Sequence, residues 1–136
     1  MAGSEYVDDQ SILDEEELWR RVPPRLIIFD NNLGVYRPTS SAFVDSPDGS
    51  PMSVVMASEA EKLNRTADSV LIGHEGYSLV SIKVSFVRSL NLGVVRNPLP
   101  NEQAHALVFG NKTKSVQRKL AKSAIWVIHY QDQTPP

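Results

Sequence analysis

The stretch HALVFGNKTKSVQRKL, residues 105–120, contains the clearest succession of local structures in this chain. The apolar run over residues 104–109 predicts a buried strand, and Gly110 directly after it predicts a tight turn. Over residues 113–124 the apolar side chains recur at helical spacing, and the basic side chains lie off that stripe. We therefore expect a strand, a glycine turn and a basic helix, in that order.

Outward from this stretch, four further runs are typical of strands. Residues 26–29 are continuously apolar and end in the turn-rich DNNLG, and residues 52–56 form a second short run. Over residues 80–86 apolar side chains alternate with serine and lysine, which is the pattern of a strand with one buried face. Residues 93–96 follow within hairpin distance of that strand.

Helices are expected in two other places, and two segments allow a second interpretation. A capping-box pattern that begins at Ser58 predicts a short, exposed helix ending near residue 64. Ser11 fits an N-cap and is followed first by acids and then by arginines, which predicts a helix over residues 12–21. Alternatively, residues 18–22 form a strand. Residues 125–130 form either a last strand or the tail of the basic helix.

The order of these elements favours an α+β fold. Strands outnumber helices, so we expect a single domain with a mostly antiparallel sheet, an N-terminal helix and a basic C-terminal helix. We place a disordered acidic leader at residues 1–10, the globular domain at 11–130 and a tail at 131–136. The chain has 136 residues, long enough to bury a core without disulfides, and it has no cysteine to form them or a thiolate metal site.

Charge is distributed unevenly along the chain. Residues 1–17 hold seven acidic and no basic residues, a net −7, whereas the remaining 119 residues hold nine acidic and 14 basic residues, a net +5. The leader is therefore either simply solvated or folded back over a basic surface that it screens from anions. The sequence shows no signal peptide and no apolar run of membrane-spanning length, so we expect a cytoplasmic protein without a membrane partner.

The junction around Gly110 is the strongest candidate for a ligand site. A helix N-terminus presents N–H groups and the positive end of its dipole, which favour phosphate or carboxylate. The candidate ligand-binding residues are Gly110, Lys112, Thr113, Lys114 and Ser115 at the junction, with Arg37, Ser40 and Ser41 from an irregular segment. The junction is not a Walker A loop, because it lacks a second glycine before the lysine. A simpler interpretation is that Gly110 makes a turn and that Thr113 or Ser115 caps the helix.

The histidines are the candidate acid/base residues. His74 lies in a polar turn, and His105 begins an apolar strand, where we expect it to be hydrogen-bonded. The spacing of these two and His129 does not suggest a metal site, and no cofactor is expected. The exposed basic side chains of the last helix could contact nucleic acid phosphates, although no recognisable nucleic-acid-binding motif accompanies them.

Three functions are compatible with these residues. The first is a non-enzymatic module that binds an anionic, phosphate-containing ligand or a partner macromolecule through the Gly110 junction, Arg37 and the basic helix. The second is a small enzyme acting on a nucleotide-like substrate, with His105 or His74 as acid/base and Arg37 as phosphate clamp. The third is a protein that binds a partner through its acidic leader.

Several strings together resemble a family of small, uncharacterised bacterial proteins. They are Leu18-Trp19-Arg20-Arg21, residues 37–43, Met52-Ser53-Val54 and residues 104–115, and the resemblance extends over residues 18–127. No activity is established for that family, so the resemblance implies only a bacterial, single-domain protein. The chain is more loosely similar to compact ADP-ribosyltransferase-like domains, which begin with an aromatic–arginine strand and place hydroxyls soon after it. Glu102 is the nearest candidate for the catalytic glutamate of such domains.

Overall fold

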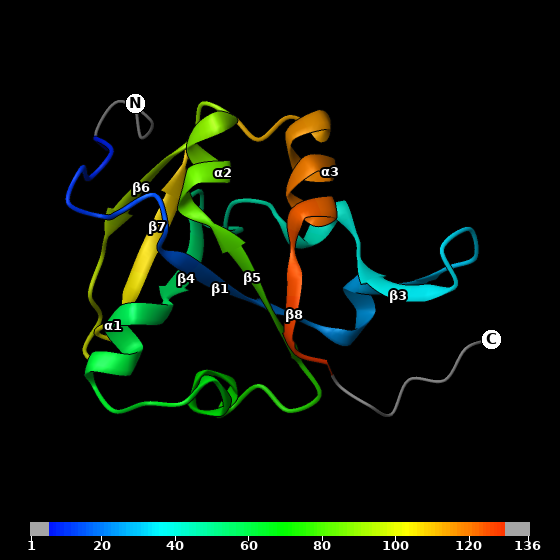
Figure 1. Cartoon of the computed structure of the whole chain (residues 1–136), viewed down its shortest axis with the longest axis horizontal. Coiled ribbons are helices and arrows are strands. Elements are labelled where there is room, and N and C mark those ends of the chain that lie inside the picture. The colour runs from blue at the N-terminus through cyan, green and yellow to red at the C-terminus, as the bar shows by residue number, and fades with distance from the viewer. Residues whose placement is uncertain (1–5, 130–136) are drawn as a thin grey trace.

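The computed structural model describes residues 6–129, which form an α+β domain around a six-stranded antiparallel sheet (Figure 1). The strands of the sheet, in the order β6-β7-β4-β1-β5-β8, are β6 (Gly93–Arg96), β7 (His105–Phe109), β4 (Met52–Met56), β1 (Glu17–Val22), β5 (Ser78–Lys83) and β8 (Ile125–Ile128). A separate hairpin of β2 (Ile27–Asp30) and β3 (Val35–Pro38) projects to one side. The helices are α1 (Ala57–Lys62), α2 (Val84–Ser89) and α3 (Lys114–Ser123), with short 3-10 turns η2 (Pro24–Leu26), η3 (Ser40–Ala42) and η4 (Ala67–Leu71).

Both faces of the sheet are covered. On one face Leu18 and Val22 of β1 pack in the main core with α2, the hairpin and Leu120 of α3. On the other face Trp19 packs in a smaller core with Ala60 of α1 and with η4. Because each fully buried leucine or valine stabilises the fold by about 1.5–3 kcal/mol, the two cores hold the sheet firmly from both sides.

The central strand β1 occupies the segment where an N-terminal helix was the first expectation. The prediction of a helix over residues 12–21 is therefore wrong, and the alternative, a strand over residues 18–22, is confirmed. β1 pairs with β5 along its whole length and with β4 at Leu18 and Trp19. A strand between two neighbours can bury apolar side chains on both faces, and this pairing outweighs the capping signals around Ser11.

The alternating run over residues 80–86 divides between a strand and a helix. β5 ends at Lys83, and α2 begins at Val84. The N–H groups of Val84 and Ser85 donate to backbone carbonyls in the segment that precedes β1. These two residues therefore do not continue the hydrogen-bonding pattern of the strand. Val84 and Val87, one helical turn apart, are both buried. The strand prediction is correct up to Lys83 and wrong beyond it.

Strand β6 exists as expected, but it does not form a hairpin with β5. It pairs with β7 at the far edge of the sheet, and three strands, β7, β4 and β1, separate it from β5. Gly93 of β6 lies opposite Phe109, whose ring covers it so closely that a Cβ at Gly93 would come within 2.3 Å of a ring carbon. Packing against this aromatic side chain therefore requires glycine at the start of β6.

The short helix α1 lies where the capping-box pattern predicts it, but Ser58 does not cap it. The helix begins one residue earlier, after Met56, without a side-chain cap. Both the N–H and the hydroxyl of Ser58 donate instead to the carboxylate of Glu16. Ser58 therefore fastens α1 to the segment that leads into β1.

The C-terminal part of the chain confirms the basic helix and decides between the two interpretations of residues 125–130. Thr113 is the N-cap of α3, and its Oγ1 accepts from the N–H of Val116 at 3.2 Å. Ala124 is extended and ends the helix, after which β8 pairs with β5 through Trp126 and Val80. Residue 130 and the proposed tail at 131–136 lie outside the described residues.

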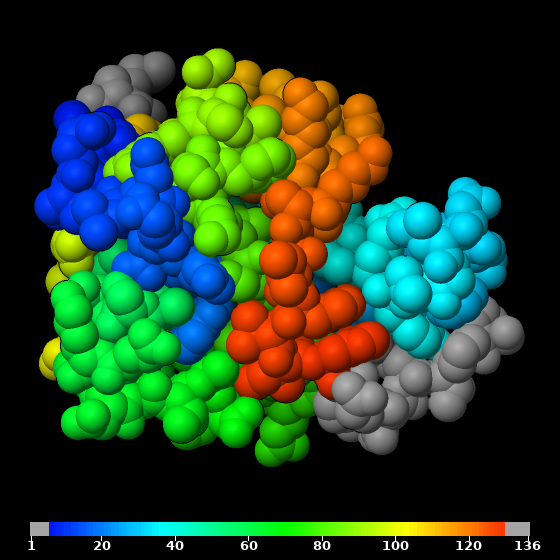
Figure 2. All heavy atoms as spheres, viewed as in Figure 1, coloured from blue at the N-terminus to red at the C-terminus, as the bar shows by residue number. Residues whose placement is uncertain are grey.

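The acidic leader is bound to the domain over the residues that the structure describes. The N–H of Asp9 donates to the carbonyl of Val94 at 2.8 Å, and the N–H of Val94 donates to a carboxylate oxygen of Asp8 at 2.9 Å. Asp8 and Asp9 are thus hydrogen-bonded to Val94 of β6, while residues 1–5 lie outside the described range. Figure 2 shows this segment, in blue, between α2 and α1.

Ion pairs reinforce this docking. Arg88 of α2 contacts Asp8 at 3.0 Å and Asp14 at 2.7 Å, and Arg96 of β6 contacts Asp9 at 3.3 Å. The leader therefore folds back over a basic surface, as the second interpretation of its charge expects, but the surface belongs to α2 and β6 and not to α3. Within residues 6–129, none of the helices is long and apolar enough to cross a membrane.

Candidate functional site

A groove with a volume of about 360 Å³ lies between the β2–β3 hairpin and α3, two segments that pack side by side in Figure 2. Three cationic side chains line it, Arg37 from the hairpin and Arg118 and Lys122 from α3. The other lining residues are Ile28, Asp30, Leu33, Thr39, Ser40 and Ala121. Two of the residues predicted to bind an anion, Arg37 and Ser40, thus share one groove with the basic helix.

The local structure explains why these side chains meet. Arg118, Ala121 and Lys122 are three and four residues apart, so they lie on one face of α3. In the hairpin, Arg37 pairs with Ile28 across the two strands, so both side chains lie on the same face. Two regular elements therefore hold the groove, rather than one loop.

The groove has an excess of positive charge. Arg37 donates through Nε to Asp30 at 2.7 Å, and this hydrogen bond lowers the pKa of the Asp30 carboxyl below its ordinary value. Arg118 and Lys122 are exposed, and neither forms an ion pair with any other residue between 6 and 129. The groove thus contains three positive charges and one negative charge, and two of its cations lack an acidic partner.

The junction at Gly110 has the geometry of a turn and a cap. Gly110 has a φ of +124°, and a Cβ there would lie 2.7 Å from Leu92, so turn conformation and packing already account for the glycine. The side chain of Lys112, only 4% exposed, contacts Asp45 at 2.6 Å. The hydroxyl of Thr113 caps α3. These are the features of the simpler interpretation of this segment.

The junction and the groove are separate places on the surface. None of the five candidate residues over 110–115 lines the groove, which begins at Arg118, about one helical turn further along α3. Lys114 and Ser115 are exposed in the first turn of α3, and Ser41 is exposed beyond the groove wall. Of the residues predicted to bind an anion, the structure brings only Arg37 and Ser40 together.

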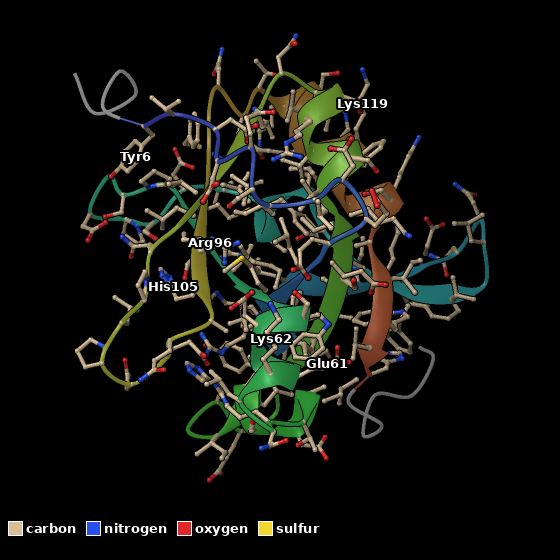
Figure 3. All side chains as sticks on the ribbon, turned by 60° about the vertical axis from the view of Figure 1, so that its left-hand side comes forward. Tyr6, Glu61, Lys62, Arg96, His105 and Lys119 are labelled. Carbon is tan, nitrogen blue, oxygen red and sulfur yellow. The ribbon has the colours of Figure 1, made fainter. Side chains whose placement is uncertain are left out.

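His74 and His105, the two candidate acid/base residues, do not line the groove that contains Arg37. Figure 3 shows His105 on β7, away from α3 and its Lys119, while the hairpin that carries Arg37 projects on the opposite side of the sheet from β7 (Figure 1). His74 packs its ring against Tyr77, with centroids 5.1 Å apart, and burial and the charge of Arg21 lower its pKa. The arrangement that a histidine acid/base with an Arg37 clamp requires is therefore not found.

His105 instead joins two residues that the sequence did not single out. Its Nε2 is hydrogen-bonded to the hydroxyl of Ser53, and its Nδ1 lies 2.7 Å from the backbone carbonyl and 3.1 Å from the side-chain oxygen of Asn97. His105 is thus the hydrogen-bonded strand residue that we expected. The only sequence signal for Ser53 is that it is a polar residue inside an apolar strand.

A second, larger pocket of about 440 Å³ lies between the leader and α1, above Trp19. Its lining includes five glutamates but also Lys62 and Arg96, which Figure 3 labels around α1 and β6. Glu59 contacts Lys62 at 3.2 Å and Arg96 at 3.4 Å. Its lining holds five carboxylates and only two cations, so the pocket carries a net negative charge that does not favour an anion.

Glu102 has a structural role in the fold. Glu102 is buried and forms an ion pair with Arg65, and its backbone closes a bridge with Leu99. Burial alone would raise the pKa of Glu102, but the hydrogen bond and charge of Arg65 lower it. Residues 6–129 hold no group of three or more side chains suited to a metal ion.

Comparisons with protein-family models, curated proteins and solved structures found no match to the chain.

Proposed function

We propose that the protein binds a small anionic, phosphate-bearing molecule in the groove between the β2–β3 hairpin and α3. The observation that carries this proposal is that three cationic side chains from two elements line the same groove. Two of these side chains, Arg118 and Lys122, have no acidic partner among the described residues. Guanidinium and ammonium groups recognise phosphate through charge-assisted hydrogen bonds. Ser40 at the groove wall adds a hydroxyl donor.

The groove also favours a ligand with an apolar part. Ile28 and Leu33 from the hairpin and Ala121 from α3 line it together with the cations. Its volume of about 360 Å³ falls within the range of roughly 300–1,000 Å³ that small-molecule pockets occupy. A phosphate joined to an aromatic or aliphatic group would therefore fill the groove better than an inorganic ion.

A fluorescence titration with 1-naphthyl phosphate tests this proposal. We expect saturable binding to the natural protein and about 100-fold weaker binding to the double variant Arg118→Glu, Lys122→Glu, because each charge-assisted contact contributes about 1.5 kcal/mol or more. 1-Naphthol, which lacks the phosphate, should bind both proteins weakly and equally. Equal affinity of the two proteins for 1-naphthyl phosphate would refute the proposal.

A matched control separates the groove from the general charge of α3. Lys114→Glu, Lys119→Glu makes the same change in charge on the same helix, at two exposed positions outside the groove. We expect it to change the affinity for 1-naphthyl phosphate less than threefold, roughly the effect of an exposed charge at a distance. If this control weakens binding of a short single-stranded RNA while the groove variant does not, α3 binds nucleic acid outside the groove.

A further inference from the structure

The hydrogen bonds of His105 determine its tautomer. Its Nδ1 faces two oxygens of Asn97, the backbone carbonyl at 2.7 Å and the side-chain oxygen at 3.1 Å, and a backbone carbonyl can only accept. Nδ1 therefore carries the proton of the neutral imidazole, and Nε2 is left as an acceptor. It follows that the hydroxyl of Ser53 donates its hydrogen bond to Nε2.

This is the arrangement of a hydroxyl with a general base. A serine hydroxyl becomes a useful nucleophile when an imidazole accepts its proton and a third group holds the imidazole in the correct tautomer. Here Ser53 is the hydroxyl, His105 the base and Asn97 the orienting group. Ser53 and His105 belong to adjacent paired strands, β4 and β7, and His105 is buried, so their relative position is rigid.

Ser53 is accessible from the face of the sheet that carries α1. Ser53 is only partly buried, and a small cavity of about 40 Å³ lies between residues 19–21 of β1 and residues 53–55 of β4. One molecule of liquid water occupies about 30 Å³, so the cavity has room for a carbonyl group but not for a long acyl chain. A substrate of small size is therefore favoured.

Arg21 supplies a positive charge at the same cavity. Its Nε donates to the carbonyl of Val70 at 2.7 Å, which fixes the side chain across the sheet face. Glu102, the acid whose charge acts on Arg21, is itself hydrogen-bonded to Arg65. Arg21 is thus placed to stabilise negative charge that develops on a carbonyl oxygen beside Ser53.

From this geometry we propose that Ser53 is an activated nucleophile that accepts the acyl group of short-chain carboxylic esters. Its Oγ forms a bond to the carbonyl carbon while its proton passes to Nε2 of His105. The ester C–O bond then breaks, His105 returns the proton to the departing alcohol, and the acyl group remains on Ser53. Attack by water, with His105 again accepting a proton, releases the carboxylic acid and restores the hydroxyl.

The experiment uses p-nitrophenyl acetate with the full chain. We expect release of p-nitrophenolate and an acetyl group that peptide mass spectrometry locates on Ser53. His105→Gln should reduce the acetylation rate about 100-fold, the usual scale of a general base. A hydrogen bond with a purely structural role would leave Ser53 without an acetyl group.

Three further variants keep the result decisive. Ser81→Ala removes another hydroxyl from the same sheet, but one that donates to the carboxylate of Glu17, and it should leave acetylation unchanged. Ser53→Ala should abolish the acetyl label. Ser53→Cys should keep acyl transfer, now through a thiol, because His105 still accepts the proton of the attacking group. Acetylation confined to lysines, or equal rates in the natural protein and Ser53→Ala with both folded by circular dichroism, would overturn the proposal.

Discussion

Arg20 replaces part of the backbone pairing between β1 and β4. Its guanidinium is partly buried, and it donates to the carbonyl of Ser53 at 2.8 Å and to the carbonyl of Ala42 at 3.0 Å. Burial lowers the pKa of Arg20 to about 10, so the side chain is still charged at neutral pH. One side chain thus satisfies carbonyl groups from two segments that the sheet leaves unpaired.

Removing this side chain should destabilise the fold. Arg20→Ala leaves two partly buried carbonyl groups without donors and opens a cavity, and we expect it to lower the free energy of unfolding by about 2–4 kcal/mol. Urea denaturation followed by circular dichroism measures the change. A loss of less than about 0.5 kcal/mol would mean that water replaces the guanidinium without cost.

Glu102 should make stability depend on acid pH. Its pKa in the folded protein is lowered from the ordinary value of 4.5: burial opposes this, but the hydrogen bond from Arg65 prevails. Its contribution is therefore fully present above about pH 4.5 and is lost as pH falls through the lowered pKa of the folded state. In urea denaturation, Glu102→Gln should be less stable than the natural protein at pH 7, and the difference should shrink toward pH 3. A constant difference over that range would contradict this account.

At the scale of elements, a substitution at the N-terminus of α3 tests whether Thr113 caps the helix or binds the ligand. Its hydroxyl accepts from the N–H of Val116, so Thr113→Ala should lower the free energy of unfolding by about 1 kcal/mol. Because the groove begins a turn later, the affinity for 1-naphthyl phosphate should not change. Weakened binding at unchanged stability would mean that the hydroxyl contacts the ligand instead of capping the helix.

The sequence predicts elements well where local and tertiary signals agree. The run over residues 104–109, Gly110 and the basic helix form as expected, because the strand is apolar, the turn needs a positive φ and Thr113 can cap. The segment before Leu18 has equally good helix signals, yet it leads into the central strand. Pairing with β4 and β5 decides that outcome, and pairing partners are far away in sequence.

The residues of the candidate site could likewise be predicted from the sequence only where the signal is local. Arg37 and Ser40 stand out in the sequence because they lie in an irregular polar segment, and both line the groove. Lys112 stands out for its charge, but its partner Asp45 is 67 residues away and could not be inferred from spacing. Ser53 and Asn97 become visible only when β4 and β7 bring them to His105.

At the scale of the whole molecule, the leader divides the basic residues into two groups. Arg88 and Arg96 are paired with aspartates of the leader, whereas Arg118 and Lys122 on α3 have no such pairing among the described residues. The overall charge of −2 therefore conceals a domain whose positive charge remains available mainly around α3 and the hairpin.

Removing the ion pairs of the leader should loosen it. Asp8→Asn with Asp14→Asn deprives Arg88 of both partners, and we expect a loss of about 1–2 kcal/mol in urea denaturation at low salt, shrinking at high salt. Glu15→Gln with Glu61→Gln removes two exposed acidic charges that make no described ion pair, and it should have little effect. Equal losses in the two double variants would show that net charge, not docking, is responsible.

The location of the anion site is tested most directly by a ¹⁵N-correlated NMR titration with 1-naphthyl phosphate. The account predicts that the amide signals of Arg37, Ser40, Arg118 and Lys122 shift together with one dissociation constant, while those of Lys114 and Ser115 at the start of α3 move little. Shifts confined to residues 110–115, or no saturable shift along the hairpin and the second half of α3, would contradict it.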